Sequence, residues 1–149
     1  MKETALFAVV LLLAAWFVWN LWSVVQLVKE LRERFWTRPV WWLRCLSLSL
    51  FTGTAVWLFG AFSGGLDVQE SCRLTHHQRY DPAYRSAHAE EFQRLFPLRN
   101  KCNASYDLVP PWVNPTVVAC SVIAVLCTAV LAWLGLSRAV TVKRKALRS

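Results

Sequence analysis

The stretch that decides the fold lies near the N-terminus and reads TALFAVVLLLAAWFVWNLWSVVQLV, from Thr4 to Val28. It contains no Asp, Glu, Lys, Arg or His. Because an α-helix rises about 1.5 Å per residue, this stretch predicts a helix about 37 Å long, enough to cross a hydrocarbon core of about 30 Å with some tilt. The apolar run is too long for a typical signal peptide and no small-x-small pattern closes it, so we expect a retained membrane span.

A second apolar block covers about residues 40–62. Pro39 precedes it, and proline is well suited to the first turn of a helix, where its missing N–H has no intrahelical partner. Arg44 lies near the start of the block, and we expect its long side chain to reach the lipid headgroups. Gly64-Gly65 follows the block and predicts the end of the helix.

A third apolar block covers about residues 115–136. Asn114-Pro115 is a helix start signal, in which Asn is expected to cap the helix and Pro to occupy its first turn. Of the 149 residues of the chain, 56% are apolar, and they gather in these three blocks instead of alternating as in a soluble core. The sequence therefore predicts an all-α membrane protein with three transmembrane helices, forming a single membrane domain over residues 1–149.

The formal net charge of +8 is carried mostly beside the apolar blocks. Five of the sixteen residues in 29–44 and five of the twelve in 138–149 are Lys or Arg. The positive-inside rule assigns such segments to the cytoplasm. The predicted connections are a cytoplasmic loop over about 29–39, an external loop over 63–114 and a cytoplasmic tail over 137–149, with the N-terminus outside. Arg outnumbers Lys, and Ile123 is the only isoleucine; this bias favours a bacterial origin and hence the plasma (inner) membrane.

The external loop contains two cysteines, Cys72 and Cys102, one near each end. Disulfides form and persist on the outer face of a membrane, so we predict a bridge between them. It would close a loop of about thirty residues and stabilise the fold by on the order of 3 kcal/mol. A catalytic thiol pair is the less favoured interpretation, because redox pairs usually have Cys-x-x-Cys spacing.

Within the loop, Asp81-Pro82 is typical of a helix N-cap followed by a first-turn proline. The pattern predicts a short amphipathic helix from about Pro82 to Phe96, stopped by Pro97. Its apolar face has helical spacing and comprises Tyr84, Ala87, His88, Phe92, Leu95 and Phe96.

A transition-metal site in the external loop is an alternative for the chemistry of this chain. Imidazole and carboxylate groups suit zinc, copper or iron, and the candidate ligands are His76, His77, His88 and Glu91. Adjacent histidines point in different directions in most backbones, and His88 shares an apolar face with Tyr84. A packed, hydrogen-bonded His88 is therefore the preferred interpretation, and no cofactor is predicted.

Small residues recur every four positions along the third block, where they would let another helix approach closely. The predicted packing interface comprises Thr116, Cys120, Ala124, Thr128 and Ala132, with Ser49-x-x-x-Gly53 repeating the theme in the second block. We expect the five residues of the third block to form one narrow face. In the first block, Asn20, Ser23 and Gln26 are polar; hydrogen bonds between helices are favoured over binding of a lipid or quinone headgroup.

These features predict a non-enzymatic integral membrane interaction protein, an accessory or assembly subunit of a larger membrane complex, with no catalytic residues assigned. Its expected partners are membrane lipids and other membrane subunits or a second copy of the chain; nucleic acid is excluded because the positive charges flank the spans. Two alternatives stay open: metal- or thiol-dependent activity in the external loop, and a homo-oligomeric pore. The spans carry no buried ionisable groups or polar stripe of the kind that ion paths use.

Overall fold

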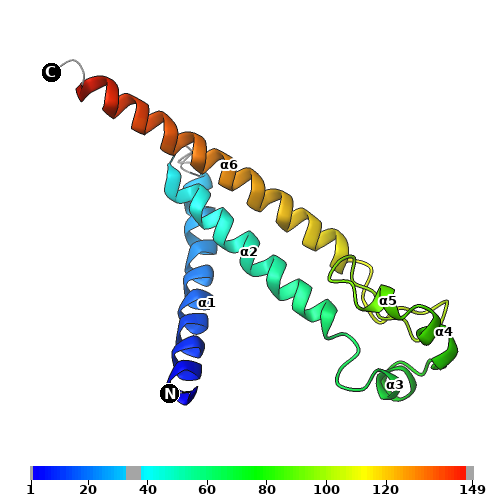
Figure 1. Ribbon diagram of the computed structural model, residues 1–149. Helices are drawn as coiled ribbons and strands as arrows, with labels where there is room; N and C mark the ends of the chain where they lie inside the picture. The colour runs from blue at the N-terminus through cyan, green and yellow to red at the C-terminus, as the bar shows by residue number, and fades with distance from the viewer. Residues whose placement is uncertain (1, 33–37, 147–149) are drawn as a thin grey trace. The chain divides into compact units, whose positions relative to one another are not determined.

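The computed structural model describes residues 2–32 and 38–146, and these residues are mostly helical with no β-strand among them. The three long helices are α1 (Lys2–Arg32), α2 (Pro39–Ala61) and α6 (Val113–Ala146) (Figure 1). Each contains a segment long and apolar enough to cross a membrane. The prediction of three helices of this kind is confirmed.

Helices α1 and α6 extend past the predicted spans, whereas α2 agrees with its predicted span to within one residue at each end. The predicted cytoplasmic loop over about 29–39 begins as helix, because α1 continues to Arg32. The predicted tail over 137–149 likewise begins as a continuation of α6, in keeping with the high helix propensity of Ala, Lys and Arg in this segment. Residues 33–37 and 147–149 lie outside the described residues.

The chain divides into two compact units. The helical unit comprises Met1–Phe51 and Cys120–Ser149, and the loop unit comprises Thr52–Ala119. The helical unit therefore contains α1, the first half of α2 and most of α6. The loop unit contains the end of α2, the whole predicted external loop and the start of α6.

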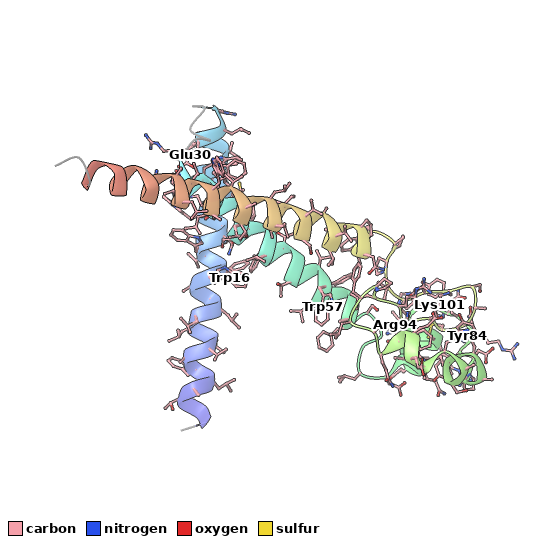
Figure 2. The ribbon with its side chains drawn as sticks, turned by 45° about the horizontal axis from the view of Figure 1, so that its top comes forward. Trp16, Glu30, Trp57, Tyr84, Arg94 and Lys101 are labelled. Carbon is pink, nitrogen blue, oxygen red and sulfur yellow. A yellow bond between two sulfur atoms is a disulfide. The ribbon has the colours of Figure 1, made fainter. Side chains whose placement is uncertain are left out.

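Within the helical unit, α1 contacts α2 through polar side chains in its second half (Figure 2). The Trp16 indole N–H donates to Ser47 Oγ over 3.2 Å, and Ser47 Oγ donates to Asn20 Oδ1 over 3.2 Å. Trp16 also packs edge-on against Phe51, with 5.1 Å between ring centroids. In apolar surroundings such bonds fix which faces of two helices meet. Asn20 thus makes the interhelical bond that its position predicts, and Ser23 is fully buried.

The loop unit is built from short elements joined by turns: α3 (Val68–Glu70), a π-helical turn (Ser71–Thr75), α4 (Pro82–Ala87) and α5 (Ala89–Phe92). Asp81 caps α4, because its carboxylate accepts a hydrogen bond from the Tyr84 N–H over 3.0 Å. The predicted start of a helix at Asp81-Pro82 is therefore confirmed.

The predicted single helix from about Pro82 to Phe96 is wrong, because the chain breaks it at His88, where φ is −117° and ψ is 22°. The Tyr84 carbonyl accepts hydrogen bonds from both the His88 N–H (3.2 Å) and the His88 Nδ1–H (2.9 Å). The imidazole thus bonds to the carbonyl that the backbone of a helix uses, and the helical path does not continue smoothly. The second piece, α5, ends at Phe92, before the predicted stop at Pro97.

Candidate functional site

The disulfide forms the centre of the loop unit. The sulfur atoms of Cys72 and Cys102 lie at disulfide-bonding distance and both residues are fully buried, so the predicted pairing is confirmed. Leu108 is buried against them, and Tyr80 and Tyr106 pack around this cluster. The bridge is therefore part of the core of the loop, where solvent does not reach the sulfurs.

A second buried cluster joins the loop to the ends of α2 and α6. It consists of Leu98, Val109 and Val113, with Val56 and Trp57 packed against it. The Trp57 indole N–H donates to the Leu95 carbonyl over 2.9 Å, which fastens the segment before Leu98 to α2. Residues far apart in the sequence thus hold the loop against the helix ends.

Asn114 does not cap α6, which corrects the sequence prediction. Helix α6 begins one residue earlier, at Val113, and the Asn114 side chain bonds to the backbone of Leu98. Its Oδ1 accepts from the Leu98 N–H over 2.9 Å, and its Nδ2 donates to the Leu98 carbonyl over 3.0 Å. The Asn114 amide thus satisfies both backbone groups of Leu98, which is buried. These two bonds stabilise the fold more than one bond at a helix terminus would, because buried polar groups without partners cost free energy.

Gly60, on the last turn of α2, allows the closest approach in this cluster. A Cβ atom added there would lie 2.7 Å from Val113 Cγ1 and 2.8 Å from Leu98 Cδ1, closer than non-bonded carbon atoms approach. The sequence prediction omitted Gly60. A seven-residue spacing from Gly53 is the signal that indicates a shared helix face.

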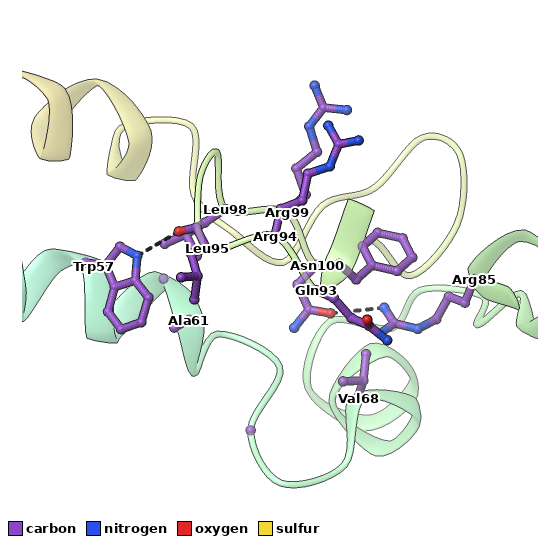
Figure 3. Close-up of a pocket in the computed structure, with 13 residues that line it drawn as sticks. Trp57, Ala61, Val68, Arg85, Gln93, Arg94, Leu95, Leu98, Arg99 and Asn100 are labelled. Atoms are coloured by element: carbon purple, nitrogen blue, oxygen red, sulfur yellow. Dashed lines mark hydrogen bonds between the residues drawn. The ribbon is translucent and has the colours of Figure 1, made fainter. Parts of the chain in front are cut away.

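Beside this cluster the loop unit encloses a hollow of about 330 Å³ (Figure 3). We call it the arginine hollow, because arginines line one side of it. Trp57, Gly60, Ala61, Leu95 and Leu98 line its apolar side. The polar groups are those of Arg85, Gln93, Arg94, Arg99 and Asn100, with Gly65, Val68 and Phe92 completing the lining. The sequence prediction missed this site because the three arginines share no local spacing and only the fold brings them together.

The three arginines of the hollow are held in different ways. Arg85 is fixed: its Nη1 donates to Asn100 Oδ1 over 3.0 Å and to the Lys101 carbonyl over 2.6 Å. Arg99 forms a partly exposed ion pair with Glu91, with 3.1 Å between Nη1 and Oε2. Arg94 has neither an ion pair nor a hydrogen bond within the described part of the chain. Arg85 is thus held in place, whereas Arg94 has no partner among the described residues that a ligand would have to displace.

The four candidate metal ligands do not converge. His76 Nδ1 lies 3.0 Å from the Tyr106 hydroxyl, and His77 is exposed. His88 is bonded to the Tyr84 carbonyl and stacks on the Tyr84 ring, and Glu91 is bonded to Arg99. Residues 2–32 and 38–146 contain no group of three or more His, Cys, Asp or Glu side chains placed to share a metal ion. The geometry therefore lends the metal alternative no support.

The predicted small-residue ladder of α6 does not lie on one face. Thr116, Cys120 and Ala124 are half-buried, whereas Thr128 and Ala132 are exposed. A four-residue repeat advances about 40° around an α-helix at each step, so its ends point in different directions. The buried and half-buried side follows alternating steps of three and four residues, through Val113, Val117, Cys120, Ala124, Cys127, Leu131 and Leu134. Ser49 of α2 is buried and Gly53 is half-buried.

The exposed end of the ladder borders an apolar hollow of about 520 Å³ in the helical unit. We call it the alanine hollow; it is lined by Leu46 and Leu50 of α2 and by Ala124, Val125, Thr128, Ala129 and Ala132 of α6. The Thr128 hydroxyl donates to the Ala124 carbonyl over 2.8 Å, so its hydrogen is already used. The surface of the hollow is consequently apolar, and four of the five residues that α6 contributes to it have short side chains.

An ion pair joins α1 and α2 within the helical unit. Arg44 Nη1 bonds to Glu30 Oε1, and only 15% of the Arg44 side chain and 19% of the Glu30 side chain are exposed. The Arg44 side chain, which was expected at the lipid headgroups, is thus paired with a carboxylate of α1. The sequence prediction left out Glu30, which lies just beyond the first apolar block. Its spacing from Lys29 and Arg32 gave no hint of a partner on another helix.

No family model, curated protein or solved structure matches this chain. What the sites do must therefore be inferred from their own chemistry.

Proposed function

We propose that this chain is a non-enzymatic integral membrane interaction protein, an accessory or assembly subunit of a larger membrane complex. The observation that carries the proposal is the alanine hollow between α2 and α6. Its occupant is an apolar transmembrane helix of another subunit. A helix fits because α6 lines the hollow mainly with short side chains, those of Ala124, Thr128, Ala129 and Ala132, over which another backbone can approach closely.

Short side chains favour helix association in a membrane because lipid provides no hydrophobic driving force for it. Lipid tails are as apolar as leucine, so burying apolar area gives two helices in a membrane no net reason to associate. Association then depends on van der Waals packing, which is best where side chains are short and backbones approach closely. Many exposed side chains of α1, such as Leu6 and Leu12, are bulky and suit contact with lipid. The alanine hollow has the opposite character.

In this proposal the chain resides in the plasma (inner) membrane of a bacterium, with its N-terminus and loop unit outside. The support is the density of Lys and Arg in residues 29–44 and 138–149. A membrane-impermeant thiol reagent should modify a probe cysteine at Ser86, an exposed position of the loop unit, in intact cells and spare one at Ser149, read against the same chain with no added cysteine. Labelling of the C-terminal probe alone would overturn the orientation.

The interaction is tested with two matched substitutions on exposed alanines of α6. Ala129→Phe fills the alanine hollow, whereas Ala119→Phe adds the same bulk at a position that does not line it. The readout is the size of the assembly that contains the chain after extraction in mild detergent, together with photo-cross-linking in the membrane from position 132, which also lines the hollow. Ala129→Phe should abolish the larger assembly, and Ala119→Phe should preserve it.

The outcomes separate the hypotheses. A cross-linked product between the chain and a second membrane protein, lost on filling the hollow, supports the proposal. A product of two copies of the chain would instead favour the homo-oligomeric pore. Cross-links to lipid alone, or equal behaviour of Ala129→Phe and Ala119→Phe, would overturn the interaction proposal.

A further inference from the structure

We propose that the arginine hollow binds the anionic headgroup of a membrane phospholipid, with the lipid chains lying along α2. This inference rests on α2 spanning the membrane, as proposed above, but not on the alanine hollow or on any protein partner. The two proposals therefore fail independently.

The positive charge of the arginine hollow is the first feature that favours an anionic ligand. The predicted external loop, residues 63–114, is balanced overall, with six Lys or Arg and six Asp or Glu residues. The lining of the arginine hollow is not balanced, because it has three arginines and no carboxylate. Asp81 caps α4, and Asp107 Oδ1 accepts from the backbone N–H groups of Asn100 and Val109, each over 3.0 Å. These carboxylates hold the backbone, and within the described residues Arg85 and Arg94 of the hollow have no carboxylate partner.

The hydrogen-bond donors that line the hollow are the second feature that favours an anionic ligand. Arg85 is fixed by Asn100 and by the Phe92 ring, whose centroid lies 4.6 Å from the guanidinium carbon. Figure 3 shows the Gln93 and Asn100 amides close to the Arg85 guanidinium, whereas Arg94 and Arg99 extend together away from Arg85, so a ligand would have to draw these two side chains in. Guanidinium groups and amides are donors that match phosphate oxygens, and arginine can bind them with two parallel hydrogen bonds.

Glu91 is the carboxylate that competes with a ligand for Arg99, and its ion pair with Arg99 is partly exposed. Glu91 pairs with Arg99, and together with Arg94 and Pro97 they border a smaller adjacent hollow. The Glu91 and Arg99 side chains are 36% and 47% exposed, and solvent-exposed ion pairs contribute little because water and salt screen them. An anion in the arginine hollow can therefore draw Arg99 away from Glu91 at small cost, while Arg94 has no partner to give up.

The apolar side of the arginine hollow favours a lipid as the source of the anion. Trp57, Gly60 and Ala61 are on the last two turns of α2, a helix apolar enough to cross a membrane. The volume of about 330 Å³ is at the lower end for ligand sites and suits a headgroup rather than a whole lipid. An amphiphile with a negative head and apolar chains satisfies both sides at once. A zwitterionic headgroup would bring its own cation toward three guanidinium groups, so a net negative headgroup is favoured.

Native mass spectrometry of the full-length chain, purified in mild detergent and stripped of lipid, tests the proposal. The probes are short-chain phosphatidylglycerol, short-chain phosphatidylcholine and inorganic phosphate. We expect one phosphatidylglycerol to bind per chain, at least tenfold more tightly than phosphatidylcholine. Arg94→Gln should weaken this binding about tenfold, and Arg94→Lys should retain more of it.

The matched control is Arg73→Gln, which removes the same charge from an exposed loop position outside the hollow. Equal weakening by Arg73→Gln and Arg94→Gln would reduce the effect to net charge and overturn the site. Equal binding of the two phospholipids would also overturn it, and inorganic phosphate binding as tightly as phosphatidylglycerol would overturn the lipid as source. An intact Cys72–Cys102 peptide in each variant, seen without reductant, verifies that the loop has folded.

Discussion

Replacing Gly60 by alanine tests the close approach at the end of α2 by adding a single methyl group. In an exposed helix this change is stabilising, because glycine costs about 1 kcal/mol relative to alanine in a helix interior. Gly135 of α6 supplies that reference, since a Cβ there would meet no atom within 4 Å beyond its chain neighbours and the backbone of its own helix. Gly135→Ala should therefore leave stability unchanged or raise it by up to about 1 kcal/mol.

At Gly60 the new methyl carbon has no space. It would meet Val113 Cγ1 at 2.7 Å and Leu98 Cδ1 at 2.8 Å, so one or both must move. Leu98 can turn its terminal methyl, but Val113 is fully buried and its branched side chain has few rotamers. Overpacking of this kind costs about 1–3 kcal/mol. Since both variants gain the same helix propensity, the difference between them should equal this cost, with Gly60→Ala the less stable.

The assay is unfolding of the purified chain in mild detergent, by heat or by titration with a denaturing detergent, followed by tryptophan fluorescence. Val113→Ala in the Gly60→Ala background removes the clashing Cγ1, so the double variant should be more stable than the sum of the single changes predicts. Equal shifts for Gly60→Ala and Gly135→Ala, or strict additivity of Gly60→Ala and Val113→Ala, would refute the reasoning.

Three further predictions follow from the described contacts. Asn114→Ala should destabilise the chain by about 1–3 kcal/mol, measured by the same unfolding assay, because it leaves a buried N–H and carbonyl without their partner; no loss would contradict the pairing. Replacing Cys72 and Cys102 together by serine should cost about 3–4 kcal/mol on the chain-entropy argument, and mass spectrometry without reductant should find the two joined in the native chain. Arg44→Met should destabilise more than Arg44→Met combined with Glu30→Gln, because the single change leaves a buried carboxylate unpaired; the reverse order would contradict the ion pair.

Three local interactions were predicted from residue order, and the structure confirms one of them and contradicts two. The Asp81 cap was predictable, because its partner is the N–H of Tyr84 only three residues away. The Asn114 cap was equally plausible by type, but the loop returns Leu98 to the same amide, and the longer-range bond prevails. The break at His88 likewise depends on which hydrogen bonds its imidazole makes in the folded loop.

The sequence by itself determined the three long helices and the pairing of the two loop cysteines. The helices follow from composition, because each block has over twenty residues, most of them apolar and with Arg44 as the one charged residue, and a helix satisfies every backbone group internally. The pairing follows from arithmetic, since Cys72 and Cys102 are the only cysteines outside the apolar blocks. Only the tertiary structure decided the split of the α6 ladder, the Glu30–Arg44 pair and the arginine hollow. Each of these depends on side chains from distant segments meeting at a particular angle and depth, and neither spacing nor composition encodes that geometry.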